Sequence, residues 1–465
     1  MNIIVIGAGR VGESVAESLV SERNDITVID TDPERLRSLQ DKLDLRGVAG
    51  NGTLPSVLKD AGAEDCDMVI ACAPQDETNL LVCKIAHDNF NVPTTIARIR
   101  SEELQAPALL NKQGGFAVDR VICPEASVTA YVHKLIEYPE ALQVLEFAGG
   151  LLSLIAVRTV AGGALLHHSL AEIPKIVPRA EMRIVAIYRG TQRLRVEGAT
   201  RIEVNDEVFV LAATRHIRPV LAALSPKVPA ARRIMIAGGG KVGLRLARQL
   251  QGSHDIKLIE SNRKRCDYLA TQLPTSALIL HGDSTDEELM DDENVQDMDL
   301  FIALTSDDED NILACLLAKR LGARRVVALI NRRAYADLVQ GTQIDIAVSP
   351  AQTVIGELLA YVRRGDVEAV HSLRRGAAEA LEIVARGDAK SSKVVGRRVE
   401  QIVLPSGAEI GAIVRGLHTT GAEPRVLIVH HDTVIEADDH VIVFLPRKRI
   451  VREVEKLFQV SATFF

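Results

Sequence analysis

A glycine-rich run near the start of the chain has the spacing needed to bind a phosphate through backbone groups. The run reads G-A-G-R-V-G and follows a strand-like apolar stretch at 2–6. The first glycine of such a loop permits a tight turn, the second admits a diphosphate and the third lets the next helix pack closely. The helix start adds unpaired N–H groups and the positive end of a dipole. The expected contacts are Gly7, Ala8, Gly9, Arg10, Val11 and Gly12.

An acidic residue follows at the place where a nucleotide ribose would lie. Asp30 ends the next expected strand, 26–30, and its carboxylate could accept hydrogen bonds from two ribose hydroxyls. A carboxylate at this place repels a 2′-phosphate, so the pattern favours NAD(H) over NADP(H). The alternative is a glycine-rich turn that binds nothing. The combination of strand, loop, helix and acid favours the nucleotide site.

Three later segments should lie at the same edge of the sheet, because parallel strands bind ligands at their carboxyl ends. Asn51 and Gly52 follow the third strand and could line an adenine. Ala73 and Pro74 follow the fourth and would border the ribose and nicotinamide. Arg98 ends the fifth strand and could reach a phosphate, although a surface ion pair explains it nearly as well.

The chain repeats this pattern once. Residues 3–12 (IIVIGAGRVG) return as 234–243 (IMIAGGGKVG), 25–30 return as 255–260, and 66–86 return as 298–318. The repeat is therefore a tandem duplication of a unit of about 230 residues, large enough to hold two domains.

The second copy carries its own set of candidate nucleotide contacts. Leu329 stands where the first copy has Arg98, so a phosphate clamp is missing and the pocket could be occupied or empty. The candidates are Gly238, Gly239, Gly240, Lys241, Val242, Gly243, Glu260, Asp283, Ser284, Thr305 and Ser306.

The hydrophobic pattern predicts an α/β fold with two Rossmann-like, doubly wound parallel-sheet domains, each followed by a small α+β domain. Strands expected at 2–6, 26–30, 46–48, 68–72 and 95–98 alternate with helices such as 11–20 and 79–87. Val- and Ile-rich alternation then precedes closing helices at 217–224 and 450–458. The expected domains are 1–138, 139–225, 232–366 and 367–460, with a linker at 226–231.

Composition excludes several classes of protein. The net charge of −7 and the absence of tryptophan argue against a nucleic-acid partner. No apolar stretch approaches the roughly 20 residues that span a bilayer. The six cysteines are scattered without a CxxC pair, as in a reduced cytosolic protein, and the start does not have the pattern of a signal peptide.

The sequence offers no catalytic set and no metal site, so we expect a protein that is not an enzyme. The acidic run Asp307–Asp310 is typical of a first helical turn. The histidine pairs at 167–168 and 430–431 are expected to be exposed. Two alternatives remain: an NAD-dependent oxidoreductase, and a scaffold whose nucleotide sites are vestigial.

Taken together, the motifs resemble the TrkA family of Trk potassium-uptake regulators, which are built from two regulator-of-potassium-conductance (RCK) halves. The resemblance extends over essentially the whole chain. One departure is the loop Cys72–Glu77, where that family usually has Thr-x-Ser/Asp-Asp-Glu. The matching segments are 3–12, 28–36, 48–79 and 95–100 in the first half and 236–243, 281–290 and 302–311 in the second.

The resemblance implies a role as well as a fold. Each half would have an NAD-binding N-terminal domain and a small RCK C-terminal domain. The expected ligands are NAD(H) and, in addition, ATP or ADP. The expected assembly is a homotetramer whose eight halves form a ring beneath a dimeric membrane potassium channel subunit of the TrkH/TrkG type. The protein would then be cytoplasmic and peripherally associated with the inner membrane, where nucleotides gate the pore.

Overall fold

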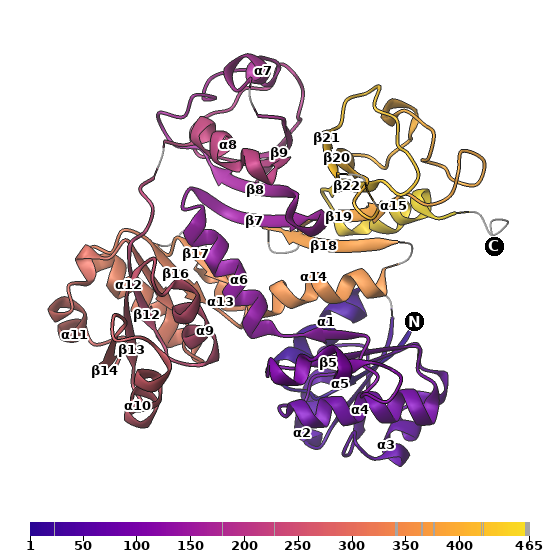
Figure 1. Cartoon of the computed structure of the whole chain (residues 1–465), viewed down its shortest axis with the longest axis vertical. Helices are drawn as coiled ribbons and strands as arrows, with labels where there is room; N and C mark the ends of the chain where they lie inside the picture. The colour runs from indigo at the N-terminus through magenta and orange to yellow at the C-terminus, as the bar shows by residue number, and fades with distance from the viewer. Residues whose placement is uncertain are drawn as a thin grey trace. The chain divides into compact units, whose positions relative to one another are not determined.

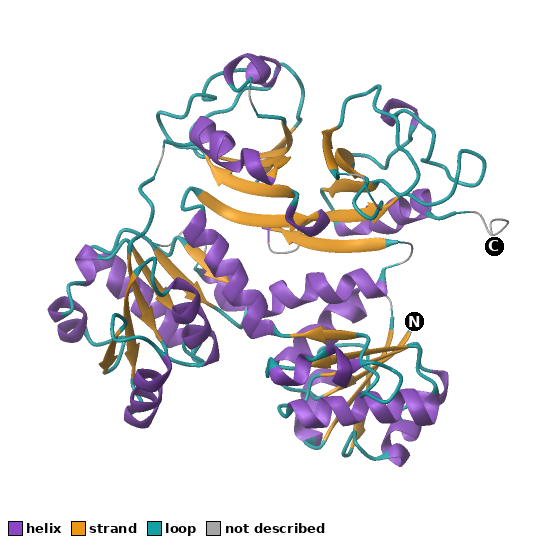
Figure 2. Cartoon of the chain, in the orientation of Figure 1, coloured by secondary structure: helices purple, strands orange, loops and turns teal. Residues whose placement is uncertain are grey.

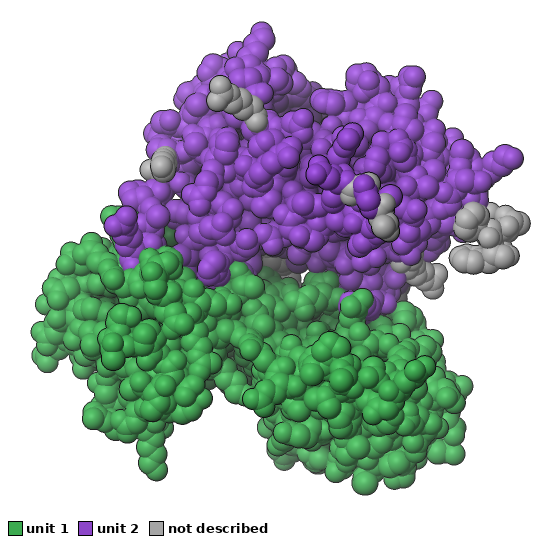
Figure 3. Space-filling view, in the orientation of Figure 1, with its two compact units in different colours: residues 1–130, 233–358 green, residues 131–232, 359–465 purple. Residues whose placement is uncertain are grey.

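The computed structural model describes residues 1–22, 24–178, 180–226, 228–339, 343–363, 366–374, 377–419, 421 and 423–460. The chain divides into two compact units, Met1–Ala130 with Arg233–Leu358 and Tyr131–Arg232 with Leu359–Phe465 (Figure 3). Each unit therefore takes one segment from each copy of the repeat. Within the expected linker at 226–231, Lys227 lies outside the described residues. The domain limits given above stay predictions.

The first copy contributes a six-stranded parallel sheet to the first unit (Figure 1). The strand order is β3-β2-β1-β4-β5-β6, which is that of a doubly wound nucleotide-binding fold. The strands are β1 (Asn2–Ile6), β2 (Asp25–Asp30), β3 (Arg46–Ala49), β4 (Met68–Ala71), β5 (Thr94–Arg98) and β6 (Arg120–Ile122). The helices are α1 (Arg10–Ser21), α2 (Pro33–Gln40), α3 (Pro55–Asp60), α4 (Asp76–Phe90), α5 (Pro107–Leu110) and α6 (Pro124–Glu137).

The second copy builds the same sheet, in the order β14-β13-β12-β15-β16-β17. Figure 2 shows helices packed along each of these sheets. The strands are β12 (Arg233–Ala237), β13 (Asp255–Glu260), β14 (Leu278–His281), β15 (Leu300–Ala303), β16 (Val326–Leu329) and β17 (Ile346–Val348). The helices are α9 (Lys241–Leu250), α10 (Arg263–Gln272), α11 (Glu287–Asp292), α12 (Asp308–Leu321), α13 (Arg333–Leu338) and α14 (Pro350–Val362).

The second unit holds two five-stranded antiparallel sheets of matching topology, β10-β9-β11-β8-β7 and β21-β20-β22-β19-β18. The first has β7 (Ala141–Phe147), β8 (Leu152–Arg158), β9 (Met182–Arg189), β10 (Gln192–Leu194) and β11 (Asp206–Ala213), with α7 (Ile173–Ile176) and α8 (Ile217–Leu224). The second has β18 (Val367–Leu373), β19 (Ala378–Val384), β20 (Glu409–Arg415), β21 (Arg425–Ile428) and β22 (His440–Leu445), with α15 (Val451–Phe458).

The two small sheets share one core. Phe147, Phe209 and Phe444 are almost completely buried in a single cluster with residues from both sheets. Each sheet also keeps the same buried ion pair, in which an arginine Nε donates to a fully buried aspartate. The distance is 2.8 Å both from Arg189 to Asp206 and from Arg415 to Asp439. The same ion pair at equivalent positions of the two sheets confirms the duplication structurally.

The predicted fold class is confirmed, with small differences at the ends of elements. The expected strand at 68–72 ends at Ala71, and the expected helix at 450–458 begins at Val451. The three-residue strands β6 and β17 were not predicted because such short runs have no periodicity to detect. Among the described residues, no helix is long and apolar enough to cross a membrane.

Candidate nucleotide-binding site

The glycine loop between β1 and α1 has a backbone conformation that requires glycine at its first and third glycine positions. Gly7 has φ +96°, which is strained for other residues, and its N–H donates to Ile29 at 2.8 Å. A Cβ on Gly12 would lie 1.8 Å from the carbonyl oxygen of Gly7, so the helix can start here only with glycine. A Cβ on Gly9 would meet no described atom within 4 Å. The second glycine thus leaves the space that a diphosphate needs.

The loop between β12 and α9 repeats this geometry. Gly238 has φ +101°, and a Cβ on Gly243 would lie 2.0 Å from the carbonyl oxygen of Gly238. Gly240 faces open space among the described residues. Gly239 differs from its counterpart Ala8, because a Cβ there would lie 2.3 Å from Leu269.

The predicted acids bind the glycine loops directly. Asp30 accepts hydrogen bonds from the N–H groups of Ala8 at 2.5 Å and Asp32 at 2.8 Å. Glu260 accepts them from Gly239 at 2.9 Å and Asn262 at 2.8 Å. Each carboxylate oxygen keeps acceptor capacity for another donor, such as a ribose hydroxyl.

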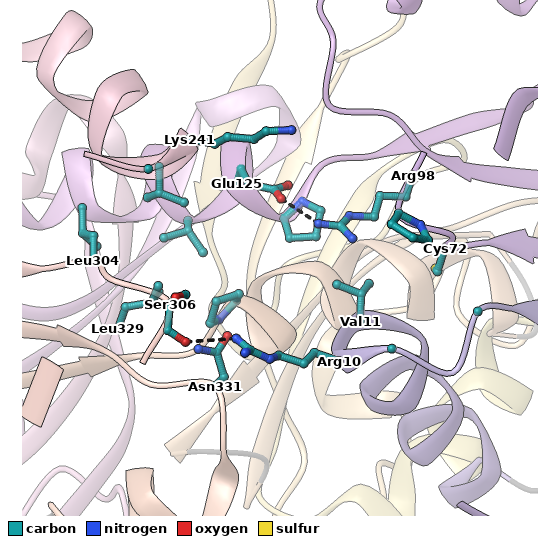
Figure 4. A pocket seen from close by; sticks show the side chains of 18 of the residues that line it. Arg10, Val11, Cys72, Arg98, Glu125, Lys241, Leu304, Ser306, Leu329 and Asn331 are labelled. Atoms are coloured by element: carbon teal, nitrogen blue, oxygen red, sulfur yellow. Dashed lines mark hydrogen bonds and ion pairs between the residues drawn. The ribbon is translucent and has the colours of Figure 1, made fainter. Parts of the chain in front are cut away.

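Both loops open onto one cavity of about 610 Å³ within the first unit (Figure 4). This volume lies in the usual range for a site that takes a small molecule or cofactor. Twelve of the predicted contacts line it: Gly7, Gly9, Arg10, Val11, Asp30, Pro74, Arg98, Gly240, Lys241, Val242, Thr305 and Ser306.

The other predicted contacts lie outside the cavity lining. Asn51 and Asp283 turn their Oδ1 atoms back onto the N–H groups of Thr53 and Thr285, at 3.0 and 2.8 Å. The N–H of Ala73 donates to the side chain of Asn79. Also outside are Ala8, Gly12, Gly52, Gly238, Gly239, Gly243, Glu260 and Ser284.

Sequence reasoning missed part of the cavity wall. Pro124 and Pro350 follow the two strands that were too short to predict, and both begin helices. Alignment of 118–127 with 344–353 could have marked them as equivalent residues at the strand ends. The lining residues not predicted are Arg35, Cys72, Pro124, Glu125, Val128, Leu304, Leu329, Asn331 and Pro350.

Arg98 forms an ion pair that is mostly buried and does not lie on the surface, and its contact with a phosphate stays a prediction. Its Nη2 lies 2.6 Å from Glu125 Oε1, and both side chains are mostly buried in the cavity wall. Among the described residues, the buried Nε of Arg98 has no hydrogen-bond partner. Burial raises the pKa of the neighbouring Cys72 thiol to about 12, and the charge of Arg98 offsets this only in part. Cys72 is therefore a neutral thiol at neutral pH.

Two asparagines hold the strand ends together, a role that the sequence did not reveal. The Nδ2 of Asn79 donates to the carbonyl oxygens of Ala73 at 3.0 Å and Arg98 at 2.8 Å. In the second copy Asn311 makes the same bonds to Thr305 at 3.1 Å and Leu329 at 2.9 Å. These bonds fix the loops after β4 and β15.

The acidic run and the histidine pairs lie as predicted. Asp307 caps α12 by accepting from the N–H groups of Glu309 at 3.0 Å and Asp310 at 3.1 Å. All four paired histidines are exposed. Within the described part of the chain, no group of three or more His, Cys, Asp or Glu residues could hold a metal ion.

Comparison with protein families decides the relationship. The TrkA-N domain model matches residues 3–124 and 234–350, and the TrkA-C domain model matches 388–459. The chain belongs to the TrkA family. The Trk system potassium uptake proteins TrkA of Halomonas elongata and Vibrio alginolyticus are 50% and 49% identical to it, over all of each chain.

Solved structures agree with this family assignment at the level of the fold. The GsuK RCK domain superposes with a TM-score of 0.61 at 15% identity, covering 98% of this chain and 94% of that one. The GsuK channel bound to NAD gives 0.61 at 16% identity, covering 98% and 78%. The TrkA-type chain thus has the fold of paired RCK domains.

Proposed function

We propose that this chain is the nucleotide-binding regulatory subunit of a Trk-type potassium uptake system. The observation that carries the proposal is the first glycine loop, which opens with Asp30 onto the shared cavity in a member of the TrkA family. The full-length relatives are named as potassium uptake proteins, and a GsuK channel of this fold has been solved with NAD bound.

The ligand is a nucleotide with a diphosphate, held mainly by the first copy. Backbone N–H groups of Gly7–Gly12 and the guanidinium of Arg98 bind the diphosphate, while Asp30 binds the ribose. NAD(H) is favoured because a carboxylate repels a 2′-phosphate. ATP and ADP offer the same ribose and diphosphate, so they are ligands as well.

Nucleotide binding controls potassium flux through a change in the shape of an assembly. Four chains form a ring of eight halves on the cytoplasmic face of a membrane channel subunit of the TrkH/TrkG type. A ligand shifts such an equilibrium only by its differential affinity for the two shapes. When the loops close on the phosphates, the hinge between the domains of each half transmits this movement to the pore.

An oxidoreductase is the competing function, and the cavity wall favours regulation. Hydride transfer needs a group beside the nicotinamide that can give or take a proton. Glu125 is engaged by Arg98, and burial raises the pKa of the Cys72 thiol to about 12, so near neutral pH this thiol does not readily give up a proton and, being protonated already, takes none up.

The proposal is tested by measuring potassium uptake in cells that lack their own gene for this protein and are given the wild type or a variant. Asp30→Ala should reduce NADH affinity roughly 10- to 100-fold, because a hydrogen bond to a charged group contributes about 1.5–3 kcal/mol, and should reduce uptake with it. Asp25→Ala is the matched control, since this exposed acid starts the same strand. Unchanged affinity and uptake in Asp30→Ala would contradict the assignment.

A further inference from the structure

A cluster of charged side chains lies inside the second small domain, where α14 ends. Arg363 follows α14, and its Nη2 donates to Glu379 Oε2 in β19 at 3.0 Å. Its Nη1 lies 3.7 Å from Glu455 Oε1 in α15, and all three side chains are at most 4% exposed. Lys448 Nζ lies 3.6 Å from the other oxygen of Glu379, so two cations balance two carboxylates. The cluster joins the end of α14 to a strand and a helix of the domain.

A second anchor lies where the chain enters β18. The carbonyl oxygen of Asp366 accepts from the N–H of Val384 in β19 at 2.8 Å. Asp366 Oδ2 lies 3.4 Å from Nε of Arg386, which also pairs with Asp438. In the first copy Val160 stands at the place of Arg386, so this ion pair belongs to the second copy alone.

The first copy has neutral side chains where the second has the charge cluster. Ser153 and Thr214 bond to each other through their hydroxyl groups at 2.9 Å. Leu221 is 2% exposed and packs in the core of the first small domain. The equivalent residues of the second copy are, in the same order, Glu379, Lys448 and Glu455.

The end of α6 is bonded less firmly than the end of α14. Glu137 stands at the place of Arg363 and pairs with Lys134 of its own helix at 3.4 Å. Lys134 also pairs with Glu146 in β7 at 2.9 Å, and these two side chains are 31% and 36% exposed. Water screens exposed ion pairs, so they hold an element in place weakly. Buried, charge-assisted hydrogen bonds are stronger and fix one geometry.

We propose that α14 and the second small domain move as one body, whereas the first half bends at the end of α6. Helix α14 has 13 residues and begins at Pro350 in the cavity wall. Movement of this wall therefore passes along the helix to the domain that holds its other end. A hinge bends where a few residues are free to absorb the change of backbone angles. The inference rests on the proposed function and assigns the bending to the first half.

Hydrogen–deuterium exchange of the full chain without nucleotide tests the anchor. After correction for intrinsic rates, the amides of 359–362 should exchange roughly tenfold or more slowly than those of 133–136. Local opening at the end of α14 must break buried ion pairs, whereas opening at the end of α6 breaks exposed ones. Equal exchange of the two segments in the wild type would overturn the inference.

A variant without the charge cluster tests the cause of this difference. R363M/E379S/K448T/E455L removes all four charges together, so its unfolding midpoint should stay within a few degrees of the wild type. Exchange at 359–362 should rise roughly tenfold, and unchanged exchange in the folded variant would overturn the inference. If this variant does not fold, R386V replaces it, with a severalfold rise expected and no rise as the contrary result. K134A in the first copy is the matched control and should leave exchange at 359–362 as in the wild type.

Addition of NADH connects the anchor to the proposed function. Exchange at 133–136 should change at least threefold more than exchange at 359–362, because the first half does the bending. A larger change at 359–362 would overturn the inference. Absence of NADH binding would instead refute the proposed function, and the comparison made without nucleotide would still decide whether α14 is anchored.

Discussion

The candidate nucleotide cleft of each copy, meaning its glycine loop and the strand ends beside it, has the same backbone as that of the other copy but different side chains around it. Both keep a left-handed first glycine, a third glycine in contact with the first, and an acid bonded to the loop. They differ near the ends of β5 and β16, where Arg98 and Arg100 correspond to Leu329 and Asn331, and at the starts of α6 and α14, where Glu125 corresponds to Ala351. The contacts that backbone atoms make are thus retained in both copies, whereas the charged side chains of the wall differ between them.

The largest expected effect concerns the glycine loop, which both copies share. Gly12→Ala and Gly243→Ala should each destabilise their domain by about 3 kcal/mol or more, because the new methyl group overlaps a carbonyl oxygen. Gly9→Ala is the matched control, since it adds the same methyl group to open space. Urea unfolding measures the difference. A Gly12→Ala protein as stable as wild type would contradict the close contact between the first and third glycines of the loop.

A smaller effect should distinguish the part of the cavity wall built by the first copy from the part built by the second. Arg98→Leu leaves Glu125 mostly buried without its partner, so it should cost roughly 1–3 kcal/mol of unfolding free energy. R98L/E125A reproduces the apolar wall of the second copy and should restore part of that loss.

A double-mutant cycle on these two residues measures the coupling. Leu329→Met, a conservative change in the apolar wall of the second copy, is the control. If the losses of unfolding free energy in the two single variants simply add up in the double variant, Arg98 and Glu125 do not stabilise each other.

The smallest effect concerns the acidic first turn of α12 in the second copy. Because the folded-state pKa of Asp310 is raised, its contribution to stability is present at low pH and is lost as pH rises through that pKa. Asp310→Asn should therefore stabilise the protein near pH 7, by a few tenths of a kcal/mol at this solvent-screened position. The gain should shrink as pH falls toward 4. Thr78→Asn in the first copy should show no such pH dependence.

Much of each cleft could be predicted from sequence, because a glycine loop, a strand and an acid have fixed spacing along the chain. The duplication strengthened that prediction, since the same residue types return in the same order. The role of Asn79 was not predictable, because its bonds to Ala73 and Arg98 depend on how two strands end.

The rest of the cavity depends on contacts between distant segments. Glu125 lies 27 residues from Arg98 and follows a strand of three residues, so no local pattern marked the pair. The joint cavity brings together loops from two copies of the repeat, and periodicity within one copy carries no information about that packing.

The central claim is that this TrkA-family chain binds nucleotides in order to regulate and not to catalyse. Calorimetric titration of the purified full chain with NADH, NAD+, ATP and ADP tests it most directly, with the nucleotides assayed again afterwards. The account predicts saturable binding with every nucleotide recovered unchanged. Absence of binding by all four, or turnover of any of them, would contradict it.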